Sequence, residues 1–232
     1  ENLDDVIIYA AAVPIDGPGG ILGQAGPCLI RSGSFLPALG GMQFDTADLA
    51  TLESQGRLLD VILHEMGHVL GFGTIWSSLG LLQNPSCGGF GSTCNPDLPG
   101  ADTHFNGATA VTSFDNVGGT AWTLGSKVPV ENTLGGPGTR DSHWRESTFG
   151  NELMTGFINA GSNPLSEVTT AGMQDIGYAV NLGSSDGYTL ANPNALVAPA
   201  LAGSIELQDD VYRGPLMVID RSGRVVRVLQ PR

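Results

Sequence analysis

The pentapeptide H-E-M-G-H at residues 64–68 constrains this chain of 232 residues more than any other feature. It lies in residues 57–71, where apolar side chains recur at helical spacing and a glycine follows as a helix stop. Residues four apart share one face of a helix, so both imidazoles can reach one metal ion. Glu65 lies about 100° round the helix from its neighbour. It is therefore a poor ligand, but it can hold a metal-bound water and take its proton.

A catalytic zinc site needs a third protein ligand and one open position. The compact pattern H-E-x-x-H-x-x-G-x-x-H would place the third histidine at residue 74, where this chain has Thr74. Gly71 is in place, and a glycine lets the chain leave the helix by a sharp turn. The third ligand must therefore come from further along the chain, beyond an insertion.

Three residues are candidates for this third ligand. His143 is followed eleven residues later by Met154, and the metzincin zinc-peptidase pattern requires a methionine turn after its last histidine. His104 has no methionine nearby. Glu152 would serve if the site used a later glutamate, as in gluzincins, but its flanks are not helical. The spacing favours His143 and leaves the other two as alternatives.

The chain resembles the leishmanolysin group of metzincin peptidases, in particular its bacterial members. The resemblance rests on HEMGHVLGFG, then a long insertion, then SHW and NELMTG. It extends to DVIIYAAAVPIDGPGGILGQAGPC and SEVTTAGMQDIGYAVN, and covers about residues 5–188.

The resemblance implies a role for each matching residue. The implied zinc ligands are His64, His68 and His143. Glu65 would be the general base and then the acid for the leaving amine. Met154 would form an apolar base under the metal, and Gly71 the turn. The chain is then a zinc-dependent endopeptidase that hydrolyses peptide bonds of a peptide or protein substrate, through a metal-bound water activated by Glu65. The alternative is a secreted, zinc-stabilised adhesin or binding module of the same fold without turnover.

The resemblance also implies a substrate strand. An extended peptide would pair with the edge strand at residues 20–25, which starts with Gly20, Ile21, Leu22 and Gly23. An ordinary glycine-rich loop is the other interpretation of this segment.

We expect an α+β fold, with a metzincin-like catalytic domain over residues 1–190. Its parts are a twisted mixed sheet, the active-site helix, a large loop-rich insertion and a C-terminal part. Residues 5–14 predict a buried strand and residues 20–30 a second one near a sheet edge, stopped by Pro27. Further elements are expected at residues 40–45 (strand), 106–114 (short helix) and 166–177 (helix). Residues 191–232 read as a linker and a small β-hairpin, either an appendage or a completion of the sheet.

In the family that the chain resembles, a strand, a helix and a strand precede the region matching Asp5. We therefore expect a separate N-terminal segment of the same precursor, which would also hold a partner for Cys28. Cys87 and Cys94 flank a Gly/Ser-rich loop that can close as a disulfide, as suits a secreted protein. Two free thiols on a surface loop are the alternative.

Composition excludes several classes of function. The 10 basic residues are scattered among 23 acidic ones, which argues against a nucleic-acid partner. No apolar stretch approaches the roughly 20 residues of a membrane span. With 41% apolar residues, disorder is also excluded. Loops around Asp97, Asp102, Asp115 and Asp141 have ligands that suit calcium, but without an EF-hand pattern a solvated surface is favoured.

Overall fold

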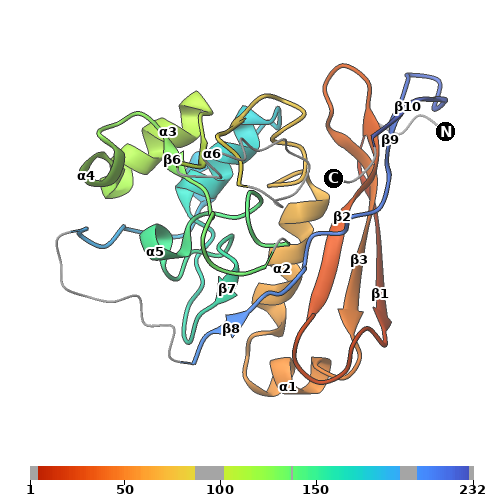
Figure 1. Ribbon diagram of the computed structural model, residues 1–232, viewed down its shortest axis with the longest axis horizontal. Coiled ribbons are helices and arrows are strands. Elements are labelled where there is room, and N and C mark those ends of the chain that lie inside the picture. Colours follow the sequence, from red (N-terminus) through yellow and green to blue (C-terminus); the bar gives the residue numbers. More distant parts are fainter. Residues whose placement is uncertain (1–4, 87–101, 137, 194–202, 230–232) are drawn as a thin grey trace.

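The structure is a computed structural model that describes residues 5–86, 102–136, 138–193 and 203–229. It has a mixed α+β architecture in which one long helix lies between a β-sheet and a second layer of short helices, short strands and loops (Figure 1). That helix, α2 (Leu58–Val69), carries the pentapeptide and confirms the helix predicted there.

The main sheet has five strands in the order β1-β3-β2-β9-β10. Their bounds are β1 (Ile7–Val13), β2 (Gly23–Arg31), β3 (Pro37–Asp45), β9 (Leu216–Ile219) and β10 (Val225–Leu229). β1 is parallel to β3, β2 is antiparallel to β3 and parallel to β9, and β10 is antiparallel to β9. The last two strands therefore extend the sheet instead of forming a separate appendage.

The prediction that the first strand is buried is wrong. Most of β1 is exposed, and Tyr9 keeps 65% of its surface. Among the described residues β1 is an edge strand of the sheet, and α2 packs mainly over β2 and β3. An apolar run predicts a strand, but not whether another element covers it.

The prediction that Pro27 stops the second strand at a sheet edge is also wrong. β2 continues through Pro27 to Arg31 and lies between β3 and β9. On the β9 side, Ala25 pairs with Val211 and the ladder resumes at Leu29, so Pro27 falls in the gap between them. Its missing N–H removes no ladder bond there, and the register to β3 shifts just after it. Of the expected substrate positions, only Gly23 lies in β2, and Gly20, Ile21 and Leu22 precede it.

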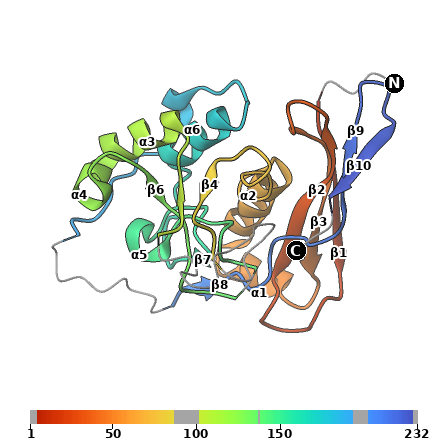
Figure 2. The same ribbon diagram turned by 45° about the horizontal axis from the view of Figure 1, so that its top comes forward.

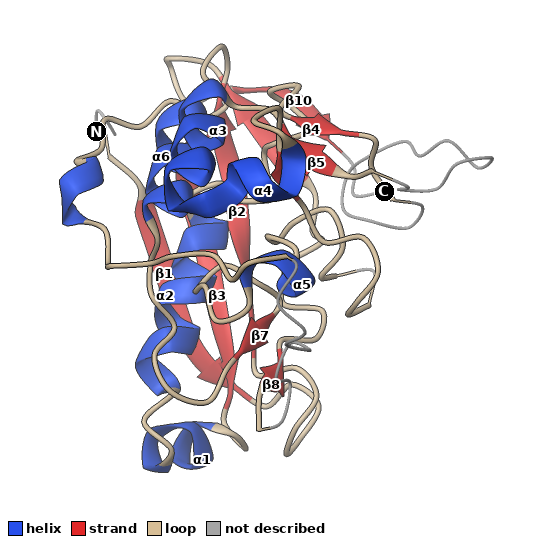
Figure 3. Ribbon diagram, turned by 90° about the vertical axis from the view of Figure 1, so that its left-hand side faces the viewer, coloured by secondary structure: helices blue, strands red, loops and turns tan. Residues whose placement is uncertain are grey.

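The second layer packs on the side of α2 that faces away from the sheet (Figure 2). Its helices α3, α4 and α6 lie in front of α2 and the sheet in the side view (Figure 3). Its elements are β4 (Leu82–Gln83), β5 (His104–Phe105), α3 (Ala108–Phe114), the π-helical turn η1 (Asp115–Gly119), α4 (Thr120–Thr123), β6 (Val128–Pro129), α5 (Glu146–Phe149), β7 (Phe157–Ile158), α6 (Glu167–Asp175), the 3₁₀ turn η2 (Leu182–Ser184) and β8 (Ile205–Glu206). The short helix α1 (Leu49–Ser54) connects β3 to α2 in the chain.

The helix predicted at residues 166–177 is confirmed as α6. The Ser166 hydroxyl caps its start by accepting from the Thr169 N–H at 3.3 Å. Gly177 follows its end with a positive φ of 117°.

Two apolar clusters hold α2 in place. On the sheet side, Val61 and Val69 are buried with Met42 and Phe44 of β3. On the other side, a Cβ atom on Gly67 would lie 2.7 Å from Cε of Met154, so glycine permits this close approach. The helix is therefore fixed from both sides, which fixes its buried histidines as well.

Two of the sequence predictions fall on residues that are not described. Cys87, Cys94 and Asp97 lie in the undescribed range 87–101, so the disulfide stays a prediction. Cys28, in β2, is a free cysteine whose thiol has its pKa raised by burial. No helix within the described ranges is long and apolar enough to cross a bilayer.

Gly71 supplies a test of the turn that ends α2. Its φ is +108°, and a Cβ atom there would lie 2.7 Å from Cδ1 of Ile75. We expect Gly71→Ala to lower the free energy of unfolding by about 2–5 kcal/mol, from the backbone penalty plus overpacking.

Gly33→Ala is the matched control, because Gly33 has a φ of +97° but no atom within 4 Å of an added Cβ. It should cost only the backbone term, about 1–2 kcal/mol. Urea unfolding followed by tryptophan fluorescence measures both. Equal losses in the two variants would show that packing around Gly71 contributes nothing.

Candidate metal centre

Three imidazole rings converge at the buried face of α2. The Nε2 atoms of His64, His68 and His143 lie 3.0–3.1 Å from one another, and all three rings are fully buried. The helix supplies the first two, one turn apart. The third comes from the loop between β6 and α5. The structure thus brings together the three histidines that the spacing favours.

The other ring nitrogen of each histidine fixes the tautomer of the neutral ring. Each Nδ1 faces a backbone carbonyl oxygen, which can only accept, so each Nδ1 carries the proton. The three contacts are His64 to Leu153 at 2.7 Å, His68 to Phe72 at 3.0 Å and His143 to Thr139 at 2.8 Å. In the neutral rings, each Nε2 then has a lone pair. Three lone pairs directed at one buried point favour a cation there.

A fourth group that the sequence analysis missed completes the cluster. Oδ2 of Asp210 lies 2.9 Å from Nε2 of His143, 3.1 Å from that of His64 and 3.7 Å from that of His68. Asp210 is 1% exposed, and its Oδ1 has no hydrogen-bond partner. Within the described ranges, these four side chains are the group that could hold a metal.

The charges at the cluster also favour a cation. Burial lowers the pKa of His68 to about 4, which keeps that ring neutral. Burial alone would raise the pKa of Asp210, but the imidazoles, His143 above all, outweigh it and hold the pKa well below its usual range. Burial likewise opposes a charge on His143, but the Asp210 carboxylate raises its pKa overall. The anionic Asp210 therefore attracts positive charge to the Nε2 atoms.

Glu65 lies beside the cluster with a carboxylate that no protein group satisfies. It is fully buried, and neither oxygen has a hydrogen-bond partner. Its Oε1 faces the start of β2, 3.2 Å from where a Cβ atom on Gly23 would be. Burial first, and then the charge of Asp210, raise the pKa of Glu65 well above its usual value. A buried, unpartnered carboxylate is costly, so its place here calls for a functional explanation.

The donor set fits zinc. Three imidazole nitrogens and one carboxylate oxygen are preferred zinc ligands, in the four-coordinate number that zinc adopts. Calcium would need six to eight oxygens, and the acidic loops do not assemble such a set in the described ranges. Asp102 pairs with Lys127 at 2.6 Å, and Asp141 accepts from the Ser86 N–H at 2.8 Å. A calcium site is therefore not supported.

Met154 lies directly under the helix face that carries the histidines. Its thioether is 1% exposed and packs against Gly67, between the two histidines of α2. The preceding residue, Leu153, supplies the carbonyl oxygen for Nδ1 of His64. This turn therefore both packs against the site and orients one of its rings.

The two alternative third ligands lie elsewhere. The Glu152 carboxylate accepts from the N–H groups of Met154 at 2.6 Å and Ser166 at 3.1 Å, so it faces the start of α6. His104, in β5, has its Nδ1 2.7 Å from the carbonyl oxygen of Asp102. Neither belongs to the four-residue group.

This geometry defines a class: an α+β domain with a buried H-E-x-x-H metal centre whose third histidine comes from a distant loop. A family model described as leishmanolysin, a peptidase family, matches residues 2–195, and the chain therefore belongs to the leishmanolysin family of zinc metalloproteases. A leishmanolysin homolog from Crithidia fasciculata is 28% identical over 226 residues, which cover 96% of this chain and 32% of that protein. The chain spans about a third of the length of that relative.

The third ligand is tested by replacing histidines singly. We expect His143→Ala to weaken zinc binding by more than about 100-fold. Loss of a residue that only hydrogen-bonds to a metal ligand usually weakens binding by no more than that. His104→Ala is the control, because that ring lies outside the cluster. Competition with a zinc-binding dye measures both affinities. A His143→Ala protein that binds zinc as tightly as the His104→Ala protein contradicts the assignment.

Proposed function

We propose that the chain is a zinc-dependent endopeptidase in which Glu65 activates the attacking water. The observation that carries this proposal is the buried, unpartnered Glu65 carboxylate beside three convergent imidazole lone pairs. Membership of a peptidase family supports it. The proposed substrates are peptides or proteins, and a secreted location stays a prediction.

In the proposed mechanism, His64, His68 and His143 hold the metal as neutral ligands through Nε2. A zinc ion there supplies Lewis acidity, which polarises a carbonyl and makes water more acidic. Glu65 takes the proton of the attacking water at a carboxylate oxygen and then delivers it to the leaving nitrogen. Burial raises the pKa of Glu65 above its usual value, which suits a group that both accepts and returns a proton.

The substrate main chain would pair with the first residues of β2, next to the cluster. Support comes from Ala25, which lies on the side of the metal centre. Its N–H and C=O both bond to the main chain of residues 210–212 of the same protein, so this edge of β2 can pair with an extended segment. Gly23 lies against Glu65 and leaves room beside its carboxylate. A peptide bound at this position would therefore place a carbonyl group close to both the metal and the base.

The second candidate function is a zinc-stabilised binding module without turnover. The observation that favours it is Asp210, because a fourth protein ligand is typical of structural zinc sites. The two functions differ in whether Glu65 takes part in any reaction.

The test is Glu65→Gln, which keeps the shape of the side chain and removes its basicity. We expect it to bind zinc normally and to lower the rate of casein hydrolysis by about 10²- to 10⁴-fold, the usual share of a general base. Because Asp210 lies at the cluster, Glu65→Gln is made both in the wild-type chain and in the Asp210→Ala chain. Each of these two variants is compared with the chain from which it was made.

Glu53→Gln is the control, because Glu53 is exposed on α1 and does not belong to the four-residue group. Hydrolysis must also stop when 1,10-phenanthroline removes the metal. A chain that hydrolyses casein equally well with and without Glu65 would falsify the mechanism. Absence of hydrolysis in every zinc-loaded form would favour the binding module.

A further inference from the structure

Residues 205–212 lie across the metal centre, and we call them the strap. Their main chain pairs with β2 as an added strand: the Ala25 N–H donates to the Asp210 carbonyl at 2.7 Å, and the Tyr212 N–H donates to the Ala25 carbonyl at 2.8 Å. The Gln24 side chain donates to the Asp209 carbonyl at 2.9 Å. The strap therefore takes the edge of β2 to which we assign the substrate.

The strap is anchored on both sides of the cluster. At its start, β8 pairs antiparallel with β7, and the Leu207 N–H donates to the Gly156 carbonyl at 3.0 Å. The Leu207 and Val211 side chains are buried. After the strap the chain enters β9, which continues along the same edge of β2.

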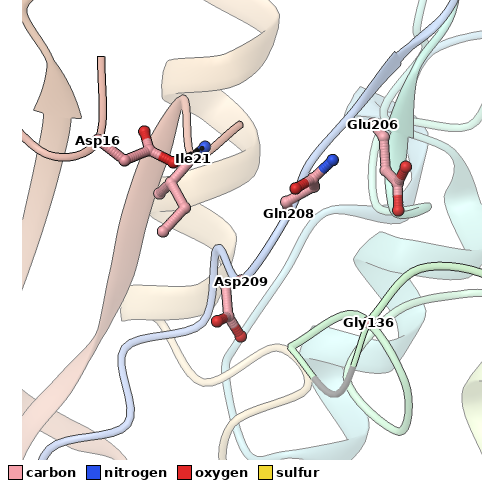
Figure 4. Close-up of a pocket in the computed structure, with 6 residues that line it drawn as sticks. All are labelled: Asp16, Ile21, Gly136, Glu206, Gln208 and Asp209. Carbon is pink, nitrogen blue, oxygen red and sulfur yellow. Dashed lines mark hydrogen bonds between the residues drawn. The ribbon is translucent and has the colours of Figure 1, made fainter. Parts of the chain in front are cut away.

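Some side chains of the strap face the interior and others face a pocket. Glu206, Gln208 and Asp209 line a pocket of about 420 Å³, together with Asp16 and Ile21 ahead of β2 and with Gly136 (Figure 4). Leu207 and Asp210 instead turn inward. The strap thus spans the space between the start of β2 and the second layer.

Two requirements of a peptidase meet at this place. The metal needs one position that no protein group takes, and the substrate needs a strand edge with free N–H and C=O groups. Oδ2 of Asp210 lies within 3.7 Å of all three Nε2 atoms. The Asp210 carbonyl and the Tyr212 N–H occupy the hydrogen-bonding groups of Ala25. One short segment therefore meets both requirements in place of a substrate.

We infer that the strap is an intramolecular inhibitor, that Asp210 is the fourth metal ligand of a latent form, and that this carboxylate must leave before a peptide can bind. The inference rests on the proposed function. It differs from the binding module in what Asp210 does: a structural ligand is needed to keep the metal, whereas an inhibitory ligand only blocks access to it.

The test compares two neighbouring aspartates of the zinc-loaded chain. Asp210→Ala removes the carboxylate from the cluster. Asp209→Asn is the matched control: its exposed carboxylate pairs with Arg213 at 3.0 Å, and asparagine tolerates its positive φ of 49°. The probe is acetohydroxamate, a small chelating ligand that does not need the strand edge. Its affinity is measured by titration of cobalt-substituted protein, from the change in the visible spectrum.

A strap that covers the metal in at least about nine-tenths of wild-type molecules lowers the apparent affinity for acetohydroxamate at least about tenfold. We therefore expect Asp210→Ala to bind acetohydroxamate at least about tenfold more tightly than wild type. Asp209→Asn should bind it as wild type does. Asp210→Ala should also keep its metal against a chelator and hydrolyse casein faster than wild type. Asp210→Asn repeats the comparison with a smaller change of volume, and metal content reports folding of each variant.

Two results overturn the inference: equal acetohydroxamate affinity in wild type and Asp210→Ala, or loss of metal from Asp210→Ala under conditions where wild type keeps it. The proposed function fails separately. Tighter probe binding without hydrolysis in Asp210→Ala favours the binding module over the peptidase and still supports the blocked metal. Equal hydrolysis and equal probe affinity in both chains support the peptidase and reject the inhibitor.

Discussion

The rest of the structure depends on the electrostatic problem of three imidazole lone pairs that point at one buried position. Each ring is held in that tautomer by a carbonyl from a different loop, namely Phe72 after α2, Thr139 before the third histidine and Leu153 in the methionine turn. The loops of the second layer therefore have to arrive at fixed places around α2. A cation at the centre would join these loops as well as the rings, so metal binding and the folding of this layer are coupled.

The part of the site that sequence reasoning predicted follows from local helical geometry. His64, Glu65 and His68 have their relative positions because they share one helix, and that geometry needs no knowledge of the fold. His143 could only be favoured over His104 and Glu152, because its approach depends on how a long insertion folds. No motif or spacing in the sequence pointed to Asp210. It is reached through pairing of the strap with β2 and β7, and such long-range contacts leave no periodicity in the sequence.

The same division applies to the fold. The two longer helices were predictable from spacing and end signals, such as Ser166 and Gly177 around α6. The exposure of β1 and the passage of β2 through Pro27 were not. Both depend on which element lies alongside: α2 packs mainly over β2 and β3, which leaves most of β1 exposed, and β9 pairs with β2 only beyond the proline. Strand burial is set by neighbours, so residue types alone do not predict it.

The anchoring of the strap at both ends has a quantitative consequence for competition. A group tethered by short connections faces its binding site at an effective concentration of millimolar order, whatever the concentration of the protein. A peptide in solution must exceed that local concentration or bind with a correspondingly higher intrinsic affinity. Loss of a single anchor, either the β7–β8 pair or the β2–β9 ladder, lengthens the tether and lowers this local concentration. Occupancy of the metal by its own chain is thus controlled by contacts that lie some distance from the metal.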